Sequence, residues 1–281
     1  MSGLYEALRR AELNQAGSNG LAEPHMDPGR VSQATIFPRI SLDHAPNLQP
    51  ETPFDPRLVT LVDDDDPGAE QFRVLGLRLK DLRKDHQLRT ILVTSSVAGE
   101  GKSVVAANLA ISLARDNEQS VLLLGGDLRC LALNHLLGCN GLRGMSDYLK
   151  GDSALTHYLY RVESLPLWFL PSGRSSSQSV PLLQSTRLMQ LLDTLSISFE
   201  WIVIDSPPLL PFADANIWAR MADGTLLVVR EGKTPKKPLL QALDSLGKAR
   251  LLGIVMNCSQ LDIHDYGDIA RYSAQRRGDI G

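Results

Sequence analysis

The sequence predicts an α/β fold, a mostly parallel β-sheet with helices on both faces. Short apolar runs alternate with longer stretches of helical periodicity along most of the chain. Aromatic residues make up only 5% of the sequence, so the core must be mainly aliphatic, as in a buried parallel sheet. The 281 residues suffice for one such domain with tails.

Composition excludes several classes of protein. A hydrophobic share of 43% and a charged share of 22% are typical of globular proteins and exclude a wholly disordered or fibrous chain. The net charge of −3 provides no basic surface, so we predict no nucleic-acid partner. The three cysteines include no Cys-x-x-Cys pair, which argues against a disulfide framework or a zinc site. Because there is neither a long apolar run nor a secretory leader, we expect a cytoplasmic protein.

Residues 1–57 are predicted to form a short N-terminal helix followed by a Pro-rich linker. Seven of the sixteen prolines lie in this stretch, which has little periodicity. Residues 4–13 are the exception, because Leu4, Ala7, Leu8 and Ala11 fall at helical spacing. This helix is either a frayed terminus or a docking peptide for a partner, and the sequence leaves both open.

Residues 58–260 are predicted to form the folded domain, and residues 261–281 a flexible C-terminal tail. The first helix begins at Pro67, and the acidic run 63–66 before it is interpreted as a solvated turn and not as a metal site. The predicted strands are Thr90–Thr94, Ser120–Leu124, Leu165–Leu170, Trp201–Ile204, Thr225–Val229 and Leu252–Met256. Further helices are expected near 102–115, 181–197, 212–221 and 235–248. This alternation implies right-handed crossovers and a parallel sheet.

A phosphate-binding loop is predicted at residues 96–103, Ser-Val-Ala-Gly-Glu-Gly-Lys-Ser, between the first strand and the next helix. It matches the Walker A pattern Gly-x-x-x-x-Gly-Lys-Ser/Thr except that Ser96 replaces the first glycine. Gly99 and Gly101 would let backbone N–H groups curl around a phosphate at the helix N-terminus. The motif and its strand–loop–helix setting predict a P-loop NTPase fold.

The remaining residues of the loop supply charge and a metal ligand. Lys102 would reach the β- and γ-phosphates, and the Ser103 hydroxyl would ligate Mg²⁺, so the expected cofactors are ATP and Mg²⁺. The predicted nucleotide-binding residues are Ser96, Ala98, Gly99, Glu100, Gly101, Lys102, Ser103, Val104 and Asn257. Asn257 ends the last strand, where it either reaches the adenine or is an ordinary strand-end residue.

A second motif is the apolar strand Trp201–Ile204, which is followed by Asp205 and then by Ser-Pro-Pro. A strand that ends in an aspartate is the Walker B pattern, and it would place the carboxylate near the metal or its water ligands. Alone the pattern is weak, but together with the upstream loop it becomes strong.

The sequence resembles the bacterial tyrosine (BY) kinases of capsule and exopolysaccharide loci, which are P-loop proteins related to the Min and Par partition ATPases. The resemblance runs from about Ala69 to Ser259 and rests on segments that begin at Ala69, Ala98, Ala106, Asp127, Asp205, Ala222 and Leu252. Val97 stands where partition ATPases usually carry an extra lysine, which favours the kinase branch. The resemblance implies Lys102, Asp127 and Asp205 as catalytic residues, and Ser103, Asp127 and Asp205 as metal ligands.

Three features depart from the family pattern: two positions, and a C-terminal tail without the family's usual dense cluster of tyrosines. The second nucleotide motif, Walker A′, ends its strand in Asp-x-Asp, but here Gly125 replaces the first aspartate. Loss of a general base costs about 10²–10⁴ in rate, so we expect slow phosphoryl transfer and a gain from Gly125→Asp. The ring-assembly motif Glu-x-x-Arg-x-x-Arg has Gly76 in place of its last arginine, which predicts a weak homo-oligomer. The tail holds only two candidate phosphoacceptors, Tyr266 and Tyr272.

The resemblance implies an ATP-dependent protein-tyrosine (auto)kinase that regulates exopolysaccharide or capsule assembly or export. A membrane adaptor or polysaccharide co-polymerase from another chain would recruit it to the inner face of the membrane. One alternative is a degenerate kinase that binds ATP and acts as a nucleotide-dependent regulator without efficient phosphoryl transfer. Another is a partition-type ATPase that positions cargo.

Overall fold

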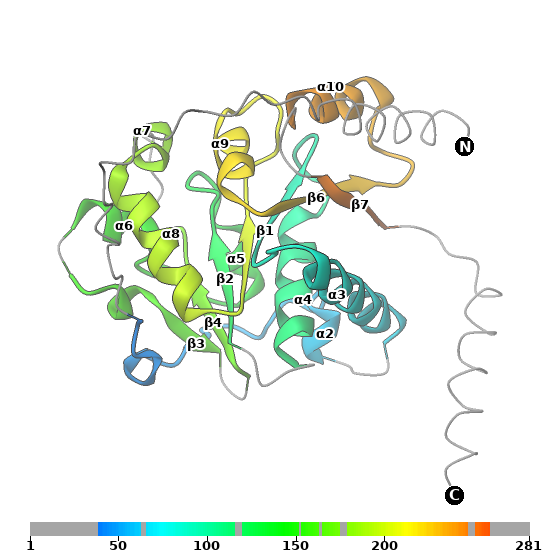
Figure 1. The fold of residues 1–281 in the computed structure, drawn as a ribbon. Coiled ribbons are helices and arrows are strands. Elements are labelled where there is room, and N and C mark those ends of the chain that lie inside the picture. Colours follow the sequence, from blue (N-terminus) through cyan, green and yellow to red (C-terminus); the bar gives the residue numbers. More distant parts are fainter. Residues whose placement is uncertain are drawn as a thin grey trace, which may run out of the picture.

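A seven-stranded sheet in the order β3-β4-β2-β5-β1-β6-β7 forms the centre of the molecule (Figure 1). The computed structural model describes residues 39–258 apart from 63–65, 116–119, 152, 163–164, 175–178 and 247–250. The strands are β1 Thr90–Ser95, β2 Val121–Gly125, β3 Tyr160–Val162, β4 Leu167–Leu170, β5 Trp201–Asp205, β6 Gly224–Arg230 and β7 Leu251–Asn257. All neighbouring pairs are parallel except β3 with β4. The predicted α/β class with a mostly parallel sheet is confirmed.

Helices connect the strands. They are α2 Val59–Val62, α3 Pro67–Asp85, α4 Lys102–Arg115, α5 Ala132–Leu136, α6 Met145–Lys150, α7 Ser179–Leu183, α8 Thr186–Ser198, α9 Asp214–Met221 and α10 Lys236–Leu246, with short 3-10 turns at Leu42–His44 and Leu155–Tyr158. The single helix expected at 181–197 is two helices. Ser185 separates them because its hydroxyl caps α8 and accepts the N–H of Leu188 at 3.2 Å.

The strand residues alternate between two apolar layers. In β1, Ile91 and Val93 pack in the layer formed with α2, α3, α4 and α5, whereas Leu92 packs in the layer formed with α6–α10. Successive side chains of a strand point to opposite faces, so both faces of the sheet are covered, as Figure 1 shows.

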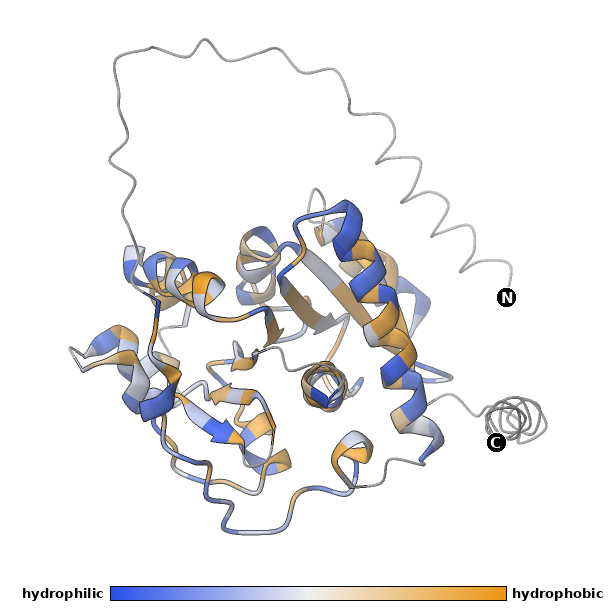
Figure 2. Ribbon diagram, turned by 60° about the horizontal axis from the view of Figure 1, so that its bottom comes forward, coloured by the Kyte–Doolittle hydropathy of each residue, from blue (hydrophilic) through white to orange (hydrophobic). Residues whose placement is uncertain are grey.

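Helix α4, which follows the phosphate loop, lies inside the first layer. Its residues from Val105 to Ala114 are all buried. A helix that is buried on all sides is one that other elements surround, and α3 and α2 pack against the outside of α4. The outer helices, by contrast, carry hydrophilic and hydrophobic residues together (Figure 2). The N-terminus of α4 is therefore held rigidly behind the loop.

Residues 39–57, here called the strap, correct our assignment of this stretch to a linker. The strap contains one 3-10 turn, Leu42–His44, and it packs against the domain. Leu48 is 3% exposed, and its N–H donates to the Arg161 carbonyl at 2.7 Å. The Ile40 N–H donates to the Ser198 hydroxyl at 3.1 Å. The packed unit therefore includes residues that we had placed outside the domain.

Other expectations concern the ends of the chain. The helix at 4–13 and the tail at 261–281, with its two tyrosines, lie outside the described residues. Of the acidic run, Asp66 is described, and its carboxylate caps α3 by accepting the N–H of Gly68 at 2.6 Å. Among the helices that the structure describes, none has the length and apolar character needed to cross a bilayer.

Candidate nucleotide site

One edge of the sheet gathers most of the residues singled out by sequence. Strands β2, β5, β1, β6 and β7 run parallel, so their carboxyl ends lie at the same edge. Ligands of open α/β sheets bind outside such carboxyl ends. The residues found there are the 96–101 loop after β1, Asp127 after β2, Asp205 at the end of β5 and Asn257 at the end of β7.

The loop itself depends on two glycines with left-handed backbone. Gly99 has φ of 83° and Gly101 has φ of 92°, a region that residues with a side chain rarely adopt. A Cβ on Gly101 would also collide with the side-chain amide of Asn257. Helix α4 begins immediately afterwards at Lys102. A loop of this shape at a helix N-terminus directs backbone N–H groups toward an anion, which fits a nucleotide phosphate.

Lys102 lies between two carboxylates. Its Nζ is 3.7 Å from Asp127 Oδ2 and 3.7 Å from Asp205 Oδ1, and all three side chains are nearly buried. The same Nζ donates to the Ser103 hydroxyl at 3.3 Å. The site thus combines one fixed cation with two acids and a hydroxyl, as a site for a metal-bound polyphosphate requires.

Asp205 is the most buried acid of this group. It is 2% exposed, and its Oδ1 has no hydrogen-bond partner. Burial raises the pKa of the Asp205 carboxyl, and the nearby Lys102 and Ser103 oppose that shift. A buried carboxylate oxygen without a donor fits a cation or one of its waters, because each supplies what the protein does not.

The two carboxylate oxygens of Asp127 have different partners. Oδ1 accepts the N–H groups of Arg129 and Cys130 at 3.1 and 3.2 Å, which fixes the turn after β2. Oδ2 faces Lys102. Within the described residues no three His, Cys, Asp or Glu side chains cluster as a metal site. Mg²⁺ is commonly held by one or two carboxylates plus substrate phosphates, so Ser103, Asp127 and Asp205 suit it as a partial ligand set.

Gly125 is the register partner of Asp205 on the neighbouring strand. A Cβ built on Gly125 would lie 2.7 Å from the Ser172 backbone nitrogen and 3.3 Å from the Pro171 carbonyl carbon. The backbone after β4 therefore closes over this position. An aspartate here would need that backbone to move, so Gly125→Asp carries a packing cost, and the gain in turnover expected from it stays a prediction.

Of the other residues predicted to bind the nucleotide, some are exposed or half-buried, and Asn257 is hydrogen-bonded within the protein. Ala98 and Gly99 are exposed, and Val104 is half-buried in the first turn of α4. The Asn257 amide donates to the Glu100 carbonyl at 2.9 Å, and its Oδ1 accepts the Cys258 N–H at 2.9 Å. Asn257 thus contacts the loop, whereas its contact with adenine stays a prediction.

Two sets of hydrogen bonds near the site could not be predicted from the sequence. Arg129 Nε lies 3.3 Å from the Asp214 carboxylate, and Nη2 donates to the Ser179 hydroxyl at 2.8 Å. Thr234 donates to the Glu100 carboxylate. These pairs are 85 and 134 residues apart, and no spacing rule connects them.

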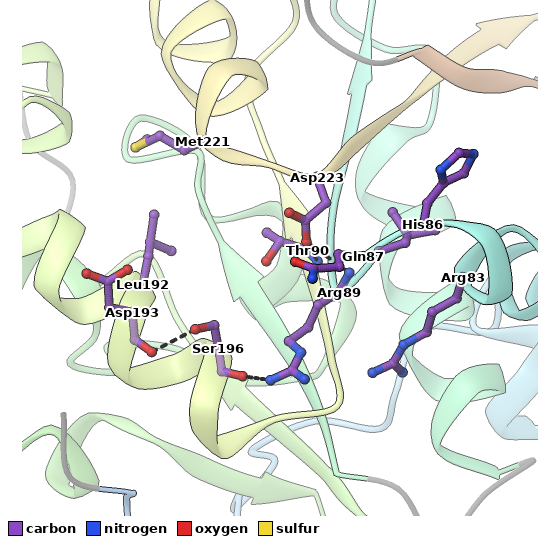
Figure 3. A pocket seen from close by; sticks show the side chains of 11 residues that line it. Arg83, His86, Gln87, Arg89, Thr90, Leu192, Asp193, Ser196, Met221 and Asp223 are labelled. Carbon is purple, nitrogen blue, oxygen red and sulfur yellow. Dashed lines mark hydrogen bonds between the residues drawn. The ribbon is translucent and has the colours of Figure 1, made fainter. Parts of the chain in front are cut away.

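A pocket of about 670 Å³ lies at the opposite edge, beside the amino ends of β1 and β6. In Figure 3 the Arg89 guanidinium reaches the Ser196 carbonyl. The Asp223 carboxylate accepts the N–H groups of Arg89 and Thr90 at 2.9 and 2.7 Å. Arg83 pairs with Glu200 at 2.8 Å. These charged groups bind to one another and to the backbone, so they join α8 to the amino ends of the strands.

Comparison with known proteins identifies the relatives of this site. No family model matches the chain. It is 32% identical to the tyrosine-protein kinase YwqD of Bacillus subtilis over 203 residues, which cover 71% of this chain and 85% of YwqD. It is 31% identical to the tyrosine-protein kinase CpsD of Streptococcus pneumoniae over 184 residues, 64% of this chain and 81% of CpsD. The 30% identity to the succinoglycan biosynthesis transport protein ExoP of Rhizobium meliloti covers 73% of this chain but only 26% of ExoP.

Three solved structures are similar to the chain in fold. The chimerical protein CapA2B2 matches with a TM-score of 0.68 at 26% identity, over 75% of this chain and 93% of that one. The cell division ATPase MinD of Pyrococcus furiosus matches with a TM-score of 0.52 at 25% identity, over 64% and 78%. A MinD from Pyrococcus horikoshii, solved with Mg-ADP, shares the fold with a TM-score of 0.51 at 23% identity, over 65% and 77%.

The fold and the loop define a P-loop protein of the MinD-like class. Within that class, the matches to YwqD and CpsD are decisive, because each spans more than four-fifths of the relative. The chain belongs to the bacterial tyrosine-protein kinase family.

Proposed function

We propose that the chain is an ATP-dependent protein-tyrosine kinase that acts in exopolysaccharide or capsule assembly or export. The observation that carries the proposal is Lys102 Nζ at 3.7 Å from both Asp127 and Asp205, at the mouth of the glycine loop. Family membership supports tyrosine as the acceptor, and the name of ExoP supports the connection to polysaccharide.

In this proposal the residues of the site hold charge and position. Bound Mg-ATP supplies the transferable phosphoryl group, and the backbone N–H groups of the loop and the Lys102 ammonium neutralise its phosphate oxygens. Ser103, Asp127 and Asp205 are the proposed metal ligands. Asp127 and Asp205, which are both buried, keep Lys102 in place through opposite charge.

The acceptor and the partner belong to the same proposal. Tyr266 and Tyr272, in the C-terminal tail, are the proposed phosphoacceptors. The proposed partner is a membrane adaptor or polysaccharide co-polymerase that recruits the chain to the inner face of the membrane.

One observation favours a second candidate, a nucleotide-dependent regulator with inefficient transfer. Gly125 supplies no carboxylate beside Asp205, and the Ser172 backbone closes over the position. A chain of this kind would bind Mg-ATP and change its affinity for a partner without much phosphorylation. The two candidates share the nucleotide site and differ in the fate of the γ-phosphate.

The deciding experiment is incubation of the full chain with labelled ATP and Mg²⁺, with and without the candidate membrane partner, followed by mapping of phosphotyrosine. The kinase proposal predicts label on Tyr266 or Tyr272, loss of that label in the double Phe variant, and no label in Lys102→Ala. Nucleotide binding without phosphotyrosine in either condition would contradict the kinase proposal and support the regulator.

A further inference from the structure

We infer that Glu100 and Ser96, which are buried, and the half-buried Thr234 form a network that positions the phosphate loop. The inference rests on the proposed function, because it concerns the same nucleotide site. Its starting point is a conflict of charge. Glu100 stands between Gly99 and Gly101, in a loop proposed to bind a polyanion, and a free carboxylate there would repel phosphate.

In the structure, hydrogen bonds from within the protein hold the Glu100 carboxylate. Glu100 is 3% exposed. The Ser96 hydroxyl lies 3.0 and 2.9 Å from its two oxygens, and the Val97 N–H donates to Oε2 at 3.0 Å. The Thr234 hydroxyl donates to Oε1. Three donors thus surround the charge, and hydrogen bonds to a charged acceptor are among the stronger ones in proteins.

This arrangement explains why a serine stands at position 96. It occupies the position where the Walker A pattern has its first glycine, and it is fully buried. A glycine would leave the Glu100 carboxylate with one donor fewer in a buried place, which is costly. Ser96 is therefore matched to Glu100 and is not a neutral variant of the glycine.

Thr234 connects the loop to β6, the strand that lies next to β1 in the sheet. It lies in the turn between β6 and α10, and its hydroxyl oxygen accepts the Arg230 N–H at 2.8 Å, so its own proton is directed to Glu100. The Asn257 amide donates to the Glu100 carbonyl at 2.9 Å, and Arg230 Nη1 donates to the Gly99 carbonyl at 3.4 Å. Contacts from β6, β7 and the turn between β6 and α10 thus hold the middle of the loop.

The network acts on the loop and not on the nucleotide. It fixes the curvature between Ser96 and Lys102 before a ligand arrives, so binding need not order that segment, and preorganisation of this kind favours affinity. Ser96, Thr234 and the Glu100 side chain are therefore positioning groups, whereas Lys102 and the backbone N–H groups make the contacts.

The test compares variants that differ by one hydroxyl. In titrations of the full chain with a fluorescent ADP analogue and Mg²⁺, Thr234→Val should raise Kd about tenfold, the order expected for loss of a hydrogen bond to a charged group. Thr234→Ser restores the hydroxyl and should stay within about twofold of the wild type. Ser96→Ala and Ser96→Gly should both weaken binding. Combined Thr234→Val and Ser96→Ala should be non-additive, because both donors serve one carboxylate.

Thermal unfolding without nucleotide shows that each variant is folded, and Thr234→Ser controls for general damage at this position. If the wild type binds the nucleotide and Thr234→Val binds it with the same affinity, the inference is overturned and the proposed function is not. The same holds if Thr234→Ser loses as much affinity as Thr234→Val. If the wild type binds no nucleotide, or Lys102→Ala binds as tightly as the wild type, the proposed function fails and this inference fails with it.

Discussion

At the scale of single residues, Gly125 and Gly76 stand where the chain departs from the family pattern, and their surroundings are opposite. A Cβ on Gly125 meets the Ser172 backbone nitrogen at 2.7 Å, whereas a Cβ on Gly76 meets Leu113 Cδ2 at 3.5 Å, an ordinary contact. A side chain at position 125 would therefore need the backbone of Ser172 to shift, whereas one at position 76 would not. Gly76 lies inside a helix, where glycine costs about 0.5–1 kcal/mol relative to alanine.

These surroundings predict opposite changes in the free energy of unfolding. Gly125→Ala should lower it by about 1–3 kcal/mol, as overpacking does. Gly76→Ala should raise it by about 0.5–1 kcal/mol. Urea denaturation of both variants and the wild type measures the difference. A Gly125→Ala variant at least as stable as the wild type would show that the backbone at 171–172 adapts, and Gly125→Asp would again be a fair test of the missing base.

The sequence reveals some residues of the site and not others for a physical reason. Lys102, Ser103 and Asp205 occur in local motifs, where a strand end or a helix start sets the position of each side chain. The bond between Thr234 and Glu100 joins residues 134 apart, and only the order of the strands brings them together. The closure of the Ser172 backbone over Gly125 is likewise invisible in the local sequence.

At the scale of elements, the strap is the feature that most changes the picture of the domain. Leu48 is buried and anchors the strap, with its N–H bonded to the Arg161 carbonyl. Leu48→Ala should lower the free energy of unfolding by about 2–4 kcal/mol, the range for deleting a buried leucine side chain. Calorimetric melts of the variant and the wild type test this, and an unaffected Leu48→Ala protein would mean that the strap adds no stability.

Deletion of residues 1–20, by contrast, should leave the melting temperature nearly unchanged. A calorimetric melt of the shortened chain tests this.

The elements predicted from apolar runs agree with the structure to within two residues at each strand end. Such runs are visible because a strand buried on both faces is apolar throughout. Strand β3 was missed because it has three residues, Arg161 in its centre, and a place at the sheet edge. The strap was missed because prolines indicate extended chain but do not show whether that chain packs against a domain.

At the scale of the whole molecule, we predict the assembly state from the residues of α3. Glu70 and Arg73 of the ring motif form an ion pair within the helix at 2.6 Å, and Gly76 lacks the third charged group. We therefore predict monomers or small oligomers at micromolar concentration without a partner, as measured by light scattering. A stable octamer under those conditions would contradict this and would mean that other surfaces replace the missing arginine.

The central claim is that the 96–103 loop, with Lys102 between Asp127 and Asp205, is a magnesium–nucleotide site. The most direct test is a calorimetric titration of Mg-ADP into the wild-type chain and into Lys102→Ala. The account predicts a measurable affinity for the wild type and a loss of about tenfold or more in the variant, because the ammonium proposed to neutralise the phosphates is gone. Equal affinity in the two proteins, or no binding by the wild type, would contradict it.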